Sequence, residues 1–227
     1  MNTESITLDV DGTEPVAALL IRPRTAVACY VFAPGAGAGM EHSFMSACAE
    51  ELASLGITTL RYQFPYMQRG SRRPDPPPIC HAAVRAAARF ANDLRPAVPL
   101  IAGGKSFGGR MTSQAQALEP LPGVRGLAFL GFPLHPPKKP SDARARHLDA
   151  VEVPMLFLQG TRDDLASLDL LQAVARGLGS RATLHLAEGA DHSFHVPARS
   201  GRQDVDVRRE LLNALAEWNK AVVAGAT

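Results

Sequence analysis

The stretch Gly104-Lys105-Ser106-Phe107-Gly108 follows an apolar run, residues 98–102, and precedes residues 110–118, whose composition favours a helix. A strand, a G-x-S-x-G turn and a helix in this order form a motif that presents a serine hydroxyl at a sharp bend. The glycines on both sides of the serine remove the Cβ atoms that would collide in such a turn. The start of the following helix directs backbone N–H groups at the same point and favours negative charge there. The stretch therefore predicts a nucleophile at Ser106 beside an oxyanion site.

Two alternative interpretations of the same stretch remain open. It could be a glycine-rich turn with an incidental serine, because the motif alone is common. Gly-Lys-Ser also resembles the end of a phosphate-binding loop. That loop requires a glycine five residues before Gly104, where Pro99 stands, so phosphate binding of this type is disfavoured.

Length and composition indicate a globular protein. At 227 residues, we expect residues 1–227 to form a single domain with a substantial core. The net charge of +2 gives no indication of nucleic-acid binding, no apolar run is long enough for a membrane span, and the N-terminus lacks the pattern of a secretory signal. The cysteines Cys29, Cys48 and Cys80 are odd in number and widely spaced, which predicts buried thiols in a reducing, cytoplasmic compartment rather than disulfides or a metal site.

Short apolar segments alternate with helical segments along the chain, a pattern typical of α/β proteins. We expect strands at residues 6–10, 16–21, 26–33, 57–62, 98–102, 124–132, 153–158 and 182–186, and helices at 43–55, 81–94, 110–118, 168–178 and 205–223. Two proline-rich connections, residues 63–78 and 133–149, are expected to be irregular. The pattern predicts a mostly parallel central sheet with helices on both faces and an antiparallel N-terminal hairpin at one edge. Functional groups in such sheets gather at the carboxyl ends of the strands.

A serine nucleophile needs an imidazole to take its proton and a carboxylate to orient that imidazole. In this architecture the three residues follow the order serine, acid, histidine. Asp163 follows the strand expected at residues 153–158 and is the candidate acid, with Asp164 as its competitor. Asp164 could instead cap the next helix.

His192 lies on the loop between the last expected strand and the last helix and is the candidate base, with His195 as the alternative. Asp191 is disfavoured as the acid, because adjacent side chains on a loop usually diverge.

An oxyanion site needs two backbone donors. The N–H of Phe107 directly follows the nucleophile, and the N–H of Ala36 lies on the small-residue loop Pro34-Gly35-Ala36-Gly37-Ala38-Gly39. Gly35-x-Gly37 could also begin a dinucleotide-binding loop. That motif needs a third glycine at position 40, which is Met40, and an acidic residue near the next strand end, where Arg61-Tyr62-Gln63 stands. We therefore expect no nucleotide cofactor, no other cofactor and no metal.

Four pieces occur in order: Pro34-Gly35-Ala36-Gly37, Gly104-Lys105-Ser106-Phe107-Gly108, Gly160-Thr161-Arg162-Asp163 and Gly189-Ala190-Asp191-His192. With them the chain resembles the α/β-hydrolase family over nearly its whole length, and its size is most similar to the small dienelactone-hydrolase-like members. The resemblance implies Ser106 as nucleophile, His192 as base, Asp163 as acid, and Ala36 and Phe107 as oxyanion donors. Dienelactone hydrolase itself has a cysteine nucleophile, and many members have His-Gly where this chain has Pro34-Gly35.

In this family a lid often lies before the strand that carries the acid. The corresponding connection here, residues 133–149, is short, so we expect an open site without a large cap, suited to small or flexible esters. Candidate pocket walls are Tyr62, Phe64, Tyr66, Met67 and His135, for which ordinary packing is an equal alternative.

The favoured hypothesis is a serine hydrolase that cleaves small carboxylic esters or thioesters through an acyl-enzyme. One alternative is a non-catalytic, hydrolase-like scaffold that binds a partner or small molecule, because fold alone does not define function. Another is an acyltransferase or peptidase that uses the same three residues with a different acceptor or substrate.

Overall fold

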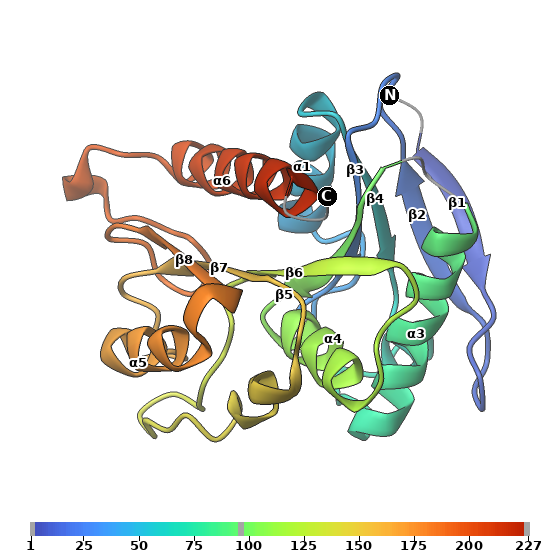
Figure 1. Cartoon of the computed structure of the whole chain (residues 1–227), viewed down its shortest axis with the longest axis horizontal. Coiled ribbons are helices and arrows are strands. Elements are labelled where there is room, and N and C mark those ends of the chain that lie inside the picture. Colours follow the sequence, from blue (N-terminus) through green and yellow to red (C-terminus); the bar gives the residue numbers. More distant parts are fainter. Residues whose placement is uncertain (1–2, 95–97, 225–227) are drawn as a thin grey trace.

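The computed structural model describes residues 3–94 and 98–224, which form an eight-stranded sheet flanked by helices (Figure 1). The strands are β1 (Thr3–Leu8), β2 (Val16–Ile21), β3 (Ala28–Ala33), β4 (Ile57–Tyr62), β5 (Leu100–Lys105), β6 (Val124–Leu130), β7 (Met155–Gly160) and β8 (Ala182–Ala187). Their spatial order is β1-β2-β4-β3-β5-β6-β7-β8. The first two pairings, β1 with β2 and β2 with β4, are antiparallel, and the others are parallel. The predicted fold class is confirmed.

Helices cover both faces of the sheet. The helices α1 (Ser43–Ser54) and α6 (Asp204–Ala224) lie on one face, and α3 (Pro77–Asp93), α4 (Phe107–Leu118) and α5 (Leu168–Leu178) lie on the other (Figure 1). A short α2 (Pro65–Gln68) and the 3₁₀ helices Arg146–Ala150, Gly179–Arg181 and Ala198–Ser200 occur in the connections. None of the helices in residues 3–94 and 98–224 combines the length and hydropathy that a bilayer crossing requires.

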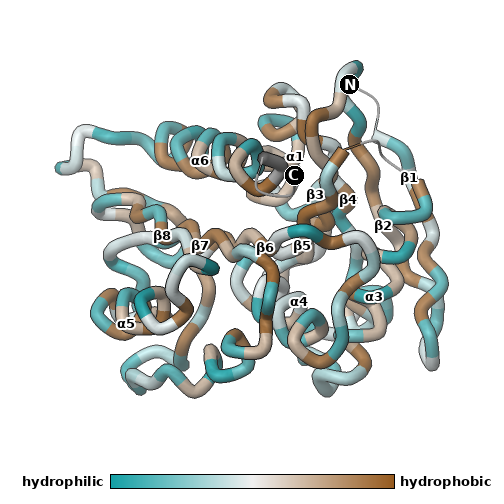
Figure 2. The backbone as a smooth tube through the Cα atoms, in the orientation of Figure 1, coloured by the Kyte–Doolittle hydropathy of each residue, from teal (hydrophilic) through white to brown (hydrophobic). Residues whose placement is uncertain are grey.

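Alternation along the buried strands produces two hydrophobic cores, one on each face. In β3, Tyr30 and Phe32 pack into the core beneath α1 and α6, whereas Cys29 and Val31 pack into the core beneath α3 and α4. Successive side chains of a strand point to opposite faces, so a strand covered on both sides is apolar throughout. Hydrophobic and hydrophilic residues alternate along the outer helices (Figure 2). The site at the strand ends is therefore supported by packed side chains from above and below.

The proline-rich connections differ from the irregular segments expected. Residues 63–78 contain α2, and α3 begins at Pro77 rather than at residue 81. Proline is favourable in the first helical turn because the N–H that it lacks would have no partner inside the helix. The connection between β6 and β7 contains the 3₁₀ helix Arg146–Ala150.

Candidate active site

Ser106 is the single residue between β5 and α4, and its backbone has φ 50° and ψ −114°. A positive φ is unfavourable for a residue with a Cβ and persists only where the surroundings hold it. The Ser106 N–H donates to the carbonyl of Leu130 over 3.0 Å, and the N–H of Arg110 donates to the carbonyl of Ser106 over 3.1 Å. These two hydrogen bonds connect the turn to the end of β6 and to the first turn of α4.

The flanking glycines are required by close packing against the end of β3. A Cβ at Gly108 would lie 2.5 Å from the carbonyl oxygen of Pro34, and a Cβ at Gly104 would collide with the carbonyl of Ala33. Real Cβ atoms do not approach backbone oxygens so closely, so any side chain here would displace the chain. The two glycines therefore let the Ser106 turn sit directly against the Pro34 loop.

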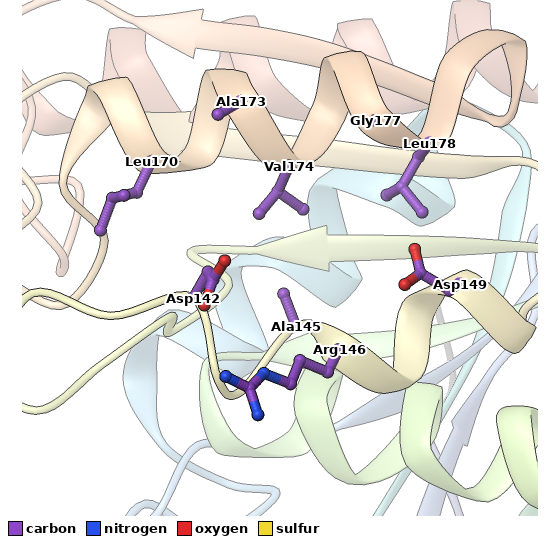
Figure 3. A pocket seen from close by; sticks show the side chains of 9 residues that line it. All are labelled: Asp142, Ala145, Arg146, Asp149, Leu170, Ala173, Val174, Gly177 and Leu178. Carbon is purple, nitrogen blue, oxygen red and sulfur yellow. The ribbon is translucent and has the colours of Figure 1, made fainter.

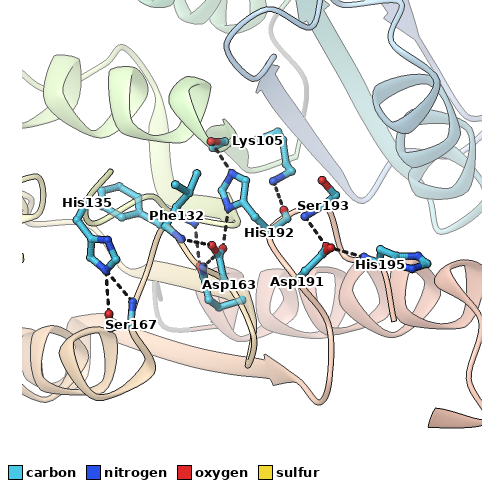
Figure 4. A network of polar contacts seen from close by, with 12 residues as sticks. Lys105, Phe132, His135, Asp163, Ser167, Asp191, His192, Ser193 and His195 are labelled. Carbon is cyan, nitrogen blue, oxygen red and sulfur yellow. Dashed lines mark hydrogen bonds and ion pairs between the residues drawn. The ribbon is translucent and has the colours of Figure 1, made fainter. Parts of the chain in front are cut away.

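Ser106, His192 and Asp163 form a hydrogen-bonded chain, although they come from three distant loops. The distance between Ser106 Oγ and His192 Nε2 is 2.8 Å, and that between His192 Nδ1 and Asp163 Oδ2 is 2.7 Å (Figure 4). With the ring proton on Nδ1, the imidazole donates to the carboxylate and accepts from the hydroxyl. This arrangement can remove the serine proton when the oxygen attacks an electrophile.

The Asp163 carboxylate is completely buried, whereas the His192 side chain is 19 % exposed. A buried charge needs hydrogen-bond partners. Besides His192, Asp163 accepts from the backbone N–H of Leu165 over 2.8 Å and from the side-chain amide of Gln159. The same Gln159 accepts from the N–H of Phe132, so the carboxylate is fixed by a network that reaches β7 and the segment after β6.

The competing candidates lie elsewhere. Asp164 is exposed. The carboxylate of Asp191 accepts the backbone N–H groups of Ser193 and His195, at 2.8 and 2.9 Å, and so shapes the loop that carries His192 (Figure 4). The imidazole of His195, 64 % exposed, pairs with Asp204 at 2.9 Å. Of the carboxylates and imidazoles that the sequence offered, the structure brings Asp163 and His192 to Ser106.

The loop that carries Ala36 lies beside Ser106 and is held by the end of β4. Gly37 has φ +71°, and the N–H of Ala38 donates to the carbonyl of Gly35 over 3.2 Å, which closes a tight turn. A side-chain oxygen of Gln63 accepts the N–H of Met40 over 3.3 Å. The N–H of Phe107, at the first residue of α4, has no partner within the helix by the geometry of helix starts. Both candidate donor residues line a cavity together with Ser106.

Lys105 was not singled out from the sequence, yet it supports the histidine loop. Its ammonium donates to the backbone carbonyl of His192 over 2.6 Å and lies 5.0 Å from the ring centre of Phe194. Burial lowers the pKa of Lys105 to about 8, while the nearby Asp163 carboxylate opposes that shift. In the sequence, only its position directly before Ser106 could have indicated that Lys105 belongs to the site. The fold shows that its side chain reaches the backbone of His192.

Two cavities meet at Ser106, and Ala36 and Leu165 line both. The first, here called the His42 cavity, has a volume of about 390 Å³ and is also lined by His42, Phe44, Met45, Lys105, His192 and Ser193. The second, here called the Arg110 cavity, has a volume of about 400 Å³ and is also lined by Pro74, Asp75, Phe107, Arg110, Met111, Pro133 and Arg144. A substrate centred on Ser106 can extend to both sides.

The expected pocket walls line neither cavity. Tyr62, Phe64 and Tyr66 are fully buried, and Phe64 and Tyr66 pack edge-on against the ring of Phe107 at 5.4 and 6.3 Å. His135 is 2 % exposed and accepts the N–H of Ser167 over 2.9 Å, which joins its loop to the start of α5. Tyr62 ends β4, Phe64 and Tyr66 lie at α2, and all three side chains pack into the core that contains Phe107. The prediction of pocket walls is therefore corrected in favour of ordinary packing.

Among residues 3–94 and 98–224, no group of three or more His, Cys, Asp or Glu side chains has the arrangement of a metal site. The three cysteines are buried and free, and burial raises the pKa of Cys29 and of Cys80 to about 12. Buried thiols of this kind are poor nucleophiles. The nucleophilic group that the geometry favours is the hydroxyl of Ser106.

Comparisons with known proteins agree with this architecture. A family model described as an alpha/beta hydrolase domain matches residues 26–220. An α/β serine hydrolase without lid from Xanthomonas campestris is 22 % identical, with a TM-score of 0.74 over 96 % of this chain and 95 % of that chain. The dienelactone hydrolase from Anabaena variabilis is 18 % identical, with a TM-score of 0.73 over 96 % of each chain. Est1E from Butyrivibrio proteoclasticus is 18 % identical, with a TM-score of 0.69 over 97 % of this chain and 99 % of that chain. Since the family model covers most of its length, this chain belongs to the α/β-hydrolase family.

Proposed function

We propose that this protein is a serine hydrolase that cleaves carboxylic esters or thioesters through an acyl-enzyme on Ser106. The observation that carries the proposal is the hydrogen-bonded chain from Ser106 Oγ to His192 Nε2, at 2.8 Å, and from His192 Nδ1 to Asp163, at 2.7 Å. Nucleophile, base and orienting acid in contact are the arrangement that acyl transfer requires. Family membership supports the same reaction class.

In the first half of the reaction, Ser106 Oγ adds to the carbonyl carbon of the substrate while its proton passes to His192 Nε2. The carbonyl oxygen becomes an oxyanion that the N–H groups of Ala36 and Phe107 stabilise. When the tetrahedral intermediate collapses, the bond to the alcohol or thiol breaks, and the leaving group takes the proton from His192. An ester between Ser106 and the acyl group remains.

In the second half, His192 takes a proton from water, whose oxygen adds to the acyl carbon. Collapse of this second intermediate breaks the bond to Ser106 Oγ, which regains the proton and releases the carboxylic acid. Asp163 holds the imidazole with its proton on Nδ1 and stabilises the imidazolium formed in each half. Its complete burial, with Leu165 and Gln159 as further donors, favours a fixed carboxylate rather than a mobile one.

The test is labelling with a fluorophosphonate probe together with turnover of short 4-nitrophenyl esters and matched thioesters. Wild type should label at one site and release nitrophenol, and Ser106→Ala should abolish both. Thr112→Ser, a buried change on the same helix away from the Ser106 hydroxyl, controls for loss of fold. Wild type that neither labels nor turns over any ester, although folded, favours a non-catalytic binding scaffold.

The same acyl-enzyme could pass its acyl group to an acceptor other than water. Product analysis with competing alcohols and amines separates the hydrolase from an acyltransferase, and peptide substrates test peptidase activity.

We propose that the protein resides in a reducing cytoplasmic compartment, and the three buried free thiols support this proposal. Fractionation of cells that express the tagged chain tests this location.

A further inference from the structure

Two arginines, Arg110 and Arg144, line the Arg110 cavity beside the nucleophile. Arg110 lies four residues after Ser106, in the first turn of α4, and its side chain and that of Ser106 line the same cavity. The guanidinium of Arg110 lies over the ring of Phe107, 5.6 Å from its centre. Arg144 comes from the connection between β6 and β7 and lines the same cavity. Two distant segments therefore bring positive charge to one side of Ser106.

Neither guanidinium has an acidic partner within the described part of the chain. No carboxylate of residues 3–94 or 98–224 lies within 4.0 Å of Arg110 or Arg144. The acid among the lining residues, Asp75, pairs with Arg69 through Oδ1 at 2.6 Å, and its Oδ2 is buried without a hydrogen-bond partner among the described residues. The Nε atom of Arg110 is buried and has no hydrogen-bond partner among the described residues. A buried guanidinium nitrogen without an acceptor is costly unless a ligand supplies one.

Burial first, and neighbouring positive charge second, disfavour protonation of the groups around this cavity. Burial, followed by the neighbouring charge of Arg144, lowers the pKa of Arg110. Burial also lowers the pKa of His147 to about 4, with Arg110 as the second cause. His147 Nε2 is engaged with the hydroxyl of Ser113 at 2.7 Å, so it remains a neutral neighbour of the cavity. Two arginines and one acid, Asp75, thus line the cavity.

We propose that Arg110 and Arg144 bind a carboxylate of the substrate, so that the substrate is an ester or thioester that carries a carboxylate on one side of the scissile bond. Guanidinium groups bind carboxylates through two parallel hydrogen bonds, which give both strength and orientation. The His42 cavity, on the other side of Ser106, accommodates the remainder of the molecule. This inference rests on the proposed function of Ser106 as the nucleophile.

The test compares matched pairs of esters that differ only in a carboxylate. One pair is 4-nitrophenyl hydrogen adipate and its methyl ester, with the carboxylate on the acyl side. The other is 4-acetoxybenzoate and its methyl ester, with the carboxylate on the alcohol side. The measured quantity is the ratio of kcat/KM for the anion to that for the neutral partner, after subtraction of the rate with Ser106→Ala.

For at least one pair, Arg110→Gln and Arg144→Gln should each lower this ratio by about 10-fold, and Arg144→Lys should restore part of it. Raised ionic strength should lower the wild-type ratio as well. Arg146→Gln is the matched control, because Arg146 is exposed and lines a different cavity, between α5 and the 3₁₀ helix Arg146–Ala150 (Figure 3). Its ratio should equal that of wild type.

The outcomes separate the two proposals. If esters are hydrolysed in a Ser106-dependent way but both glutamine variants keep the wild-type ratio for both pairs, the carboxylate subsite is wrong and the hydrolase stands. If no ester is turned over, calorimetric titration with adipate and benzoate decides the subsite independently. Binding that weakens in Arg144→Gln but not in Arg146→Gln supports it, and equal or absent binding in all three proteins overturns it. Circular dichroism of each variant confirms that it is folded.

Discussion

The His42 cavity and the Arg110 cavity are almost equal in volume, about 390 and 400 Å³, but they differ in how their charges are used. In the His42 cavity the cation is Lys105, whose ammonium is already bonded to the carbonyl of His192. In the Arg110 cavity two guanidiniums have no carboxylate within 4.0 Å among the described residues. The difference shows that a cation hydrogen-bonded to the backbone stabilises the loop that it contacts, whereas a cation without a carboxylate partner is available to a ligand.

The largest effect is expected at the centre that both cavities share. Asp163→Asn should lower kcat for every ester by about 10³- to 10⁴-fold, because the amide cannot hold the imidazole with its proton on Nδ1. Asp164→Asn, an exposed neighbour, is the matched control and should retain wild-type kcat. The measurement is steady-state turnover of a neutral ester. Equal loss in the two variants would mean that the acid has been assigned to the wrong position.

The next effect concerns the packing of the Ser106 turn against the Pro34 loop. Gly108→Ala places a methyl group 2.5 Å from the carbonyl oxygen of Pro34. The Pro34 loop or α4 must move, so we expect a loss of about 3 kcal/mol in the free energy of unfolding, together with weaker oxyanion binding. Gly177→Ala on α5, where a Cβ meets nothing within 4 Å, should instead stabilise slightly. Urea unfolding of both variants measures the difference, and a Gly108→Ala protein as stable as wild type would contradict the packing described here.

A smaller effect is expected on the pH dependence of the free energy of unfolding, to which the buried charge of Lys105 contributes. The folded protein holds Lys105 with a pKa of about 8, against 10.5 for an unperturbed lysine, so unfolding takes up a proton between these values. The contribution of Lys105 to the free energy of unfolding therefore rises with pH in this window. Relative to wild type, Lys105→Met should lose on the order of 2 kcal/mol of stability as the pH rises through that window.

Lys105→Met must be compared with wild type because the thiols of the unfolded chain, with an ordinary pKa of 9.0, lose their protons in the same pH range. In the folded protein their pKa values are raised by burial, which makes stability fall with pH, but they are present in both proteins and cancel. Lys220→Met, which removes an exposed lysine paired with Glu217, is the matched control for the loss of a lysine charge. Denaturant titrations at several pH values measure the difference. A constant difference between Lys105→Met and wild type would show that Lys105 keeps its ordinary pKa.

The smallest effect tests the apolar wall of the His42 cavity. Phe44 lines it and stacks on Phe194, with ring centres 5.8 Å apart. Phe44→Ala enlarges this cavity, so the preference among neutral 4-nitrophenyl esters should move toward longer chains by about 3-fold for each added methylene. The ratio between anionic and neutral esters, which reports on the other cavity, should change much less. Leu118→Ala, at a residue that is 73 % exposed, is the control for both readings.

Much of the architecture and of the site was accessible from local patterns. The continuous apolar run before Ala33 indicated a strand covered on both faces, and the glycines around Ser106 indicated the strained turn, because both properties depend only on neighbouring residues. The order serine, acid, histidine predicted which loops supply the acid and the base. The choice between Asp163 and Asp164 was different, since both follow the same strand and only the bend of the chain after Gly160 buries one and exposes the other.

The pocket walls were the weakest part of the prediction. Tyr62 is the last residue of β4 and Phe64 lies just beyond it, where binding residues often lie, but both side chains are fully buried in the core that contains Phe107. Prolines that signalled a loop in fact occupy the first turns of α2 and α3, where a missing N–H is tolerated. Arg110 and Arg144, 34 positions apart in the numbering, could be associated only once the chain was folded.

The amino-acid sequence by itself determined the alternation of strands and helices, the turn that exposes Ser106 and the segments that supply an acid and a histidine, because these follow from backbone geometry and periodic hydrophobicity within short windows. Tertiary structure decided which carboxylate meets the imidazole, which aromatic residues are buried, and which cations are left without partners. Those outcomes depend on distances between segments that are remote in the chain, and such distances arise only when the two hydrophobic cores pack the helices against the sheet.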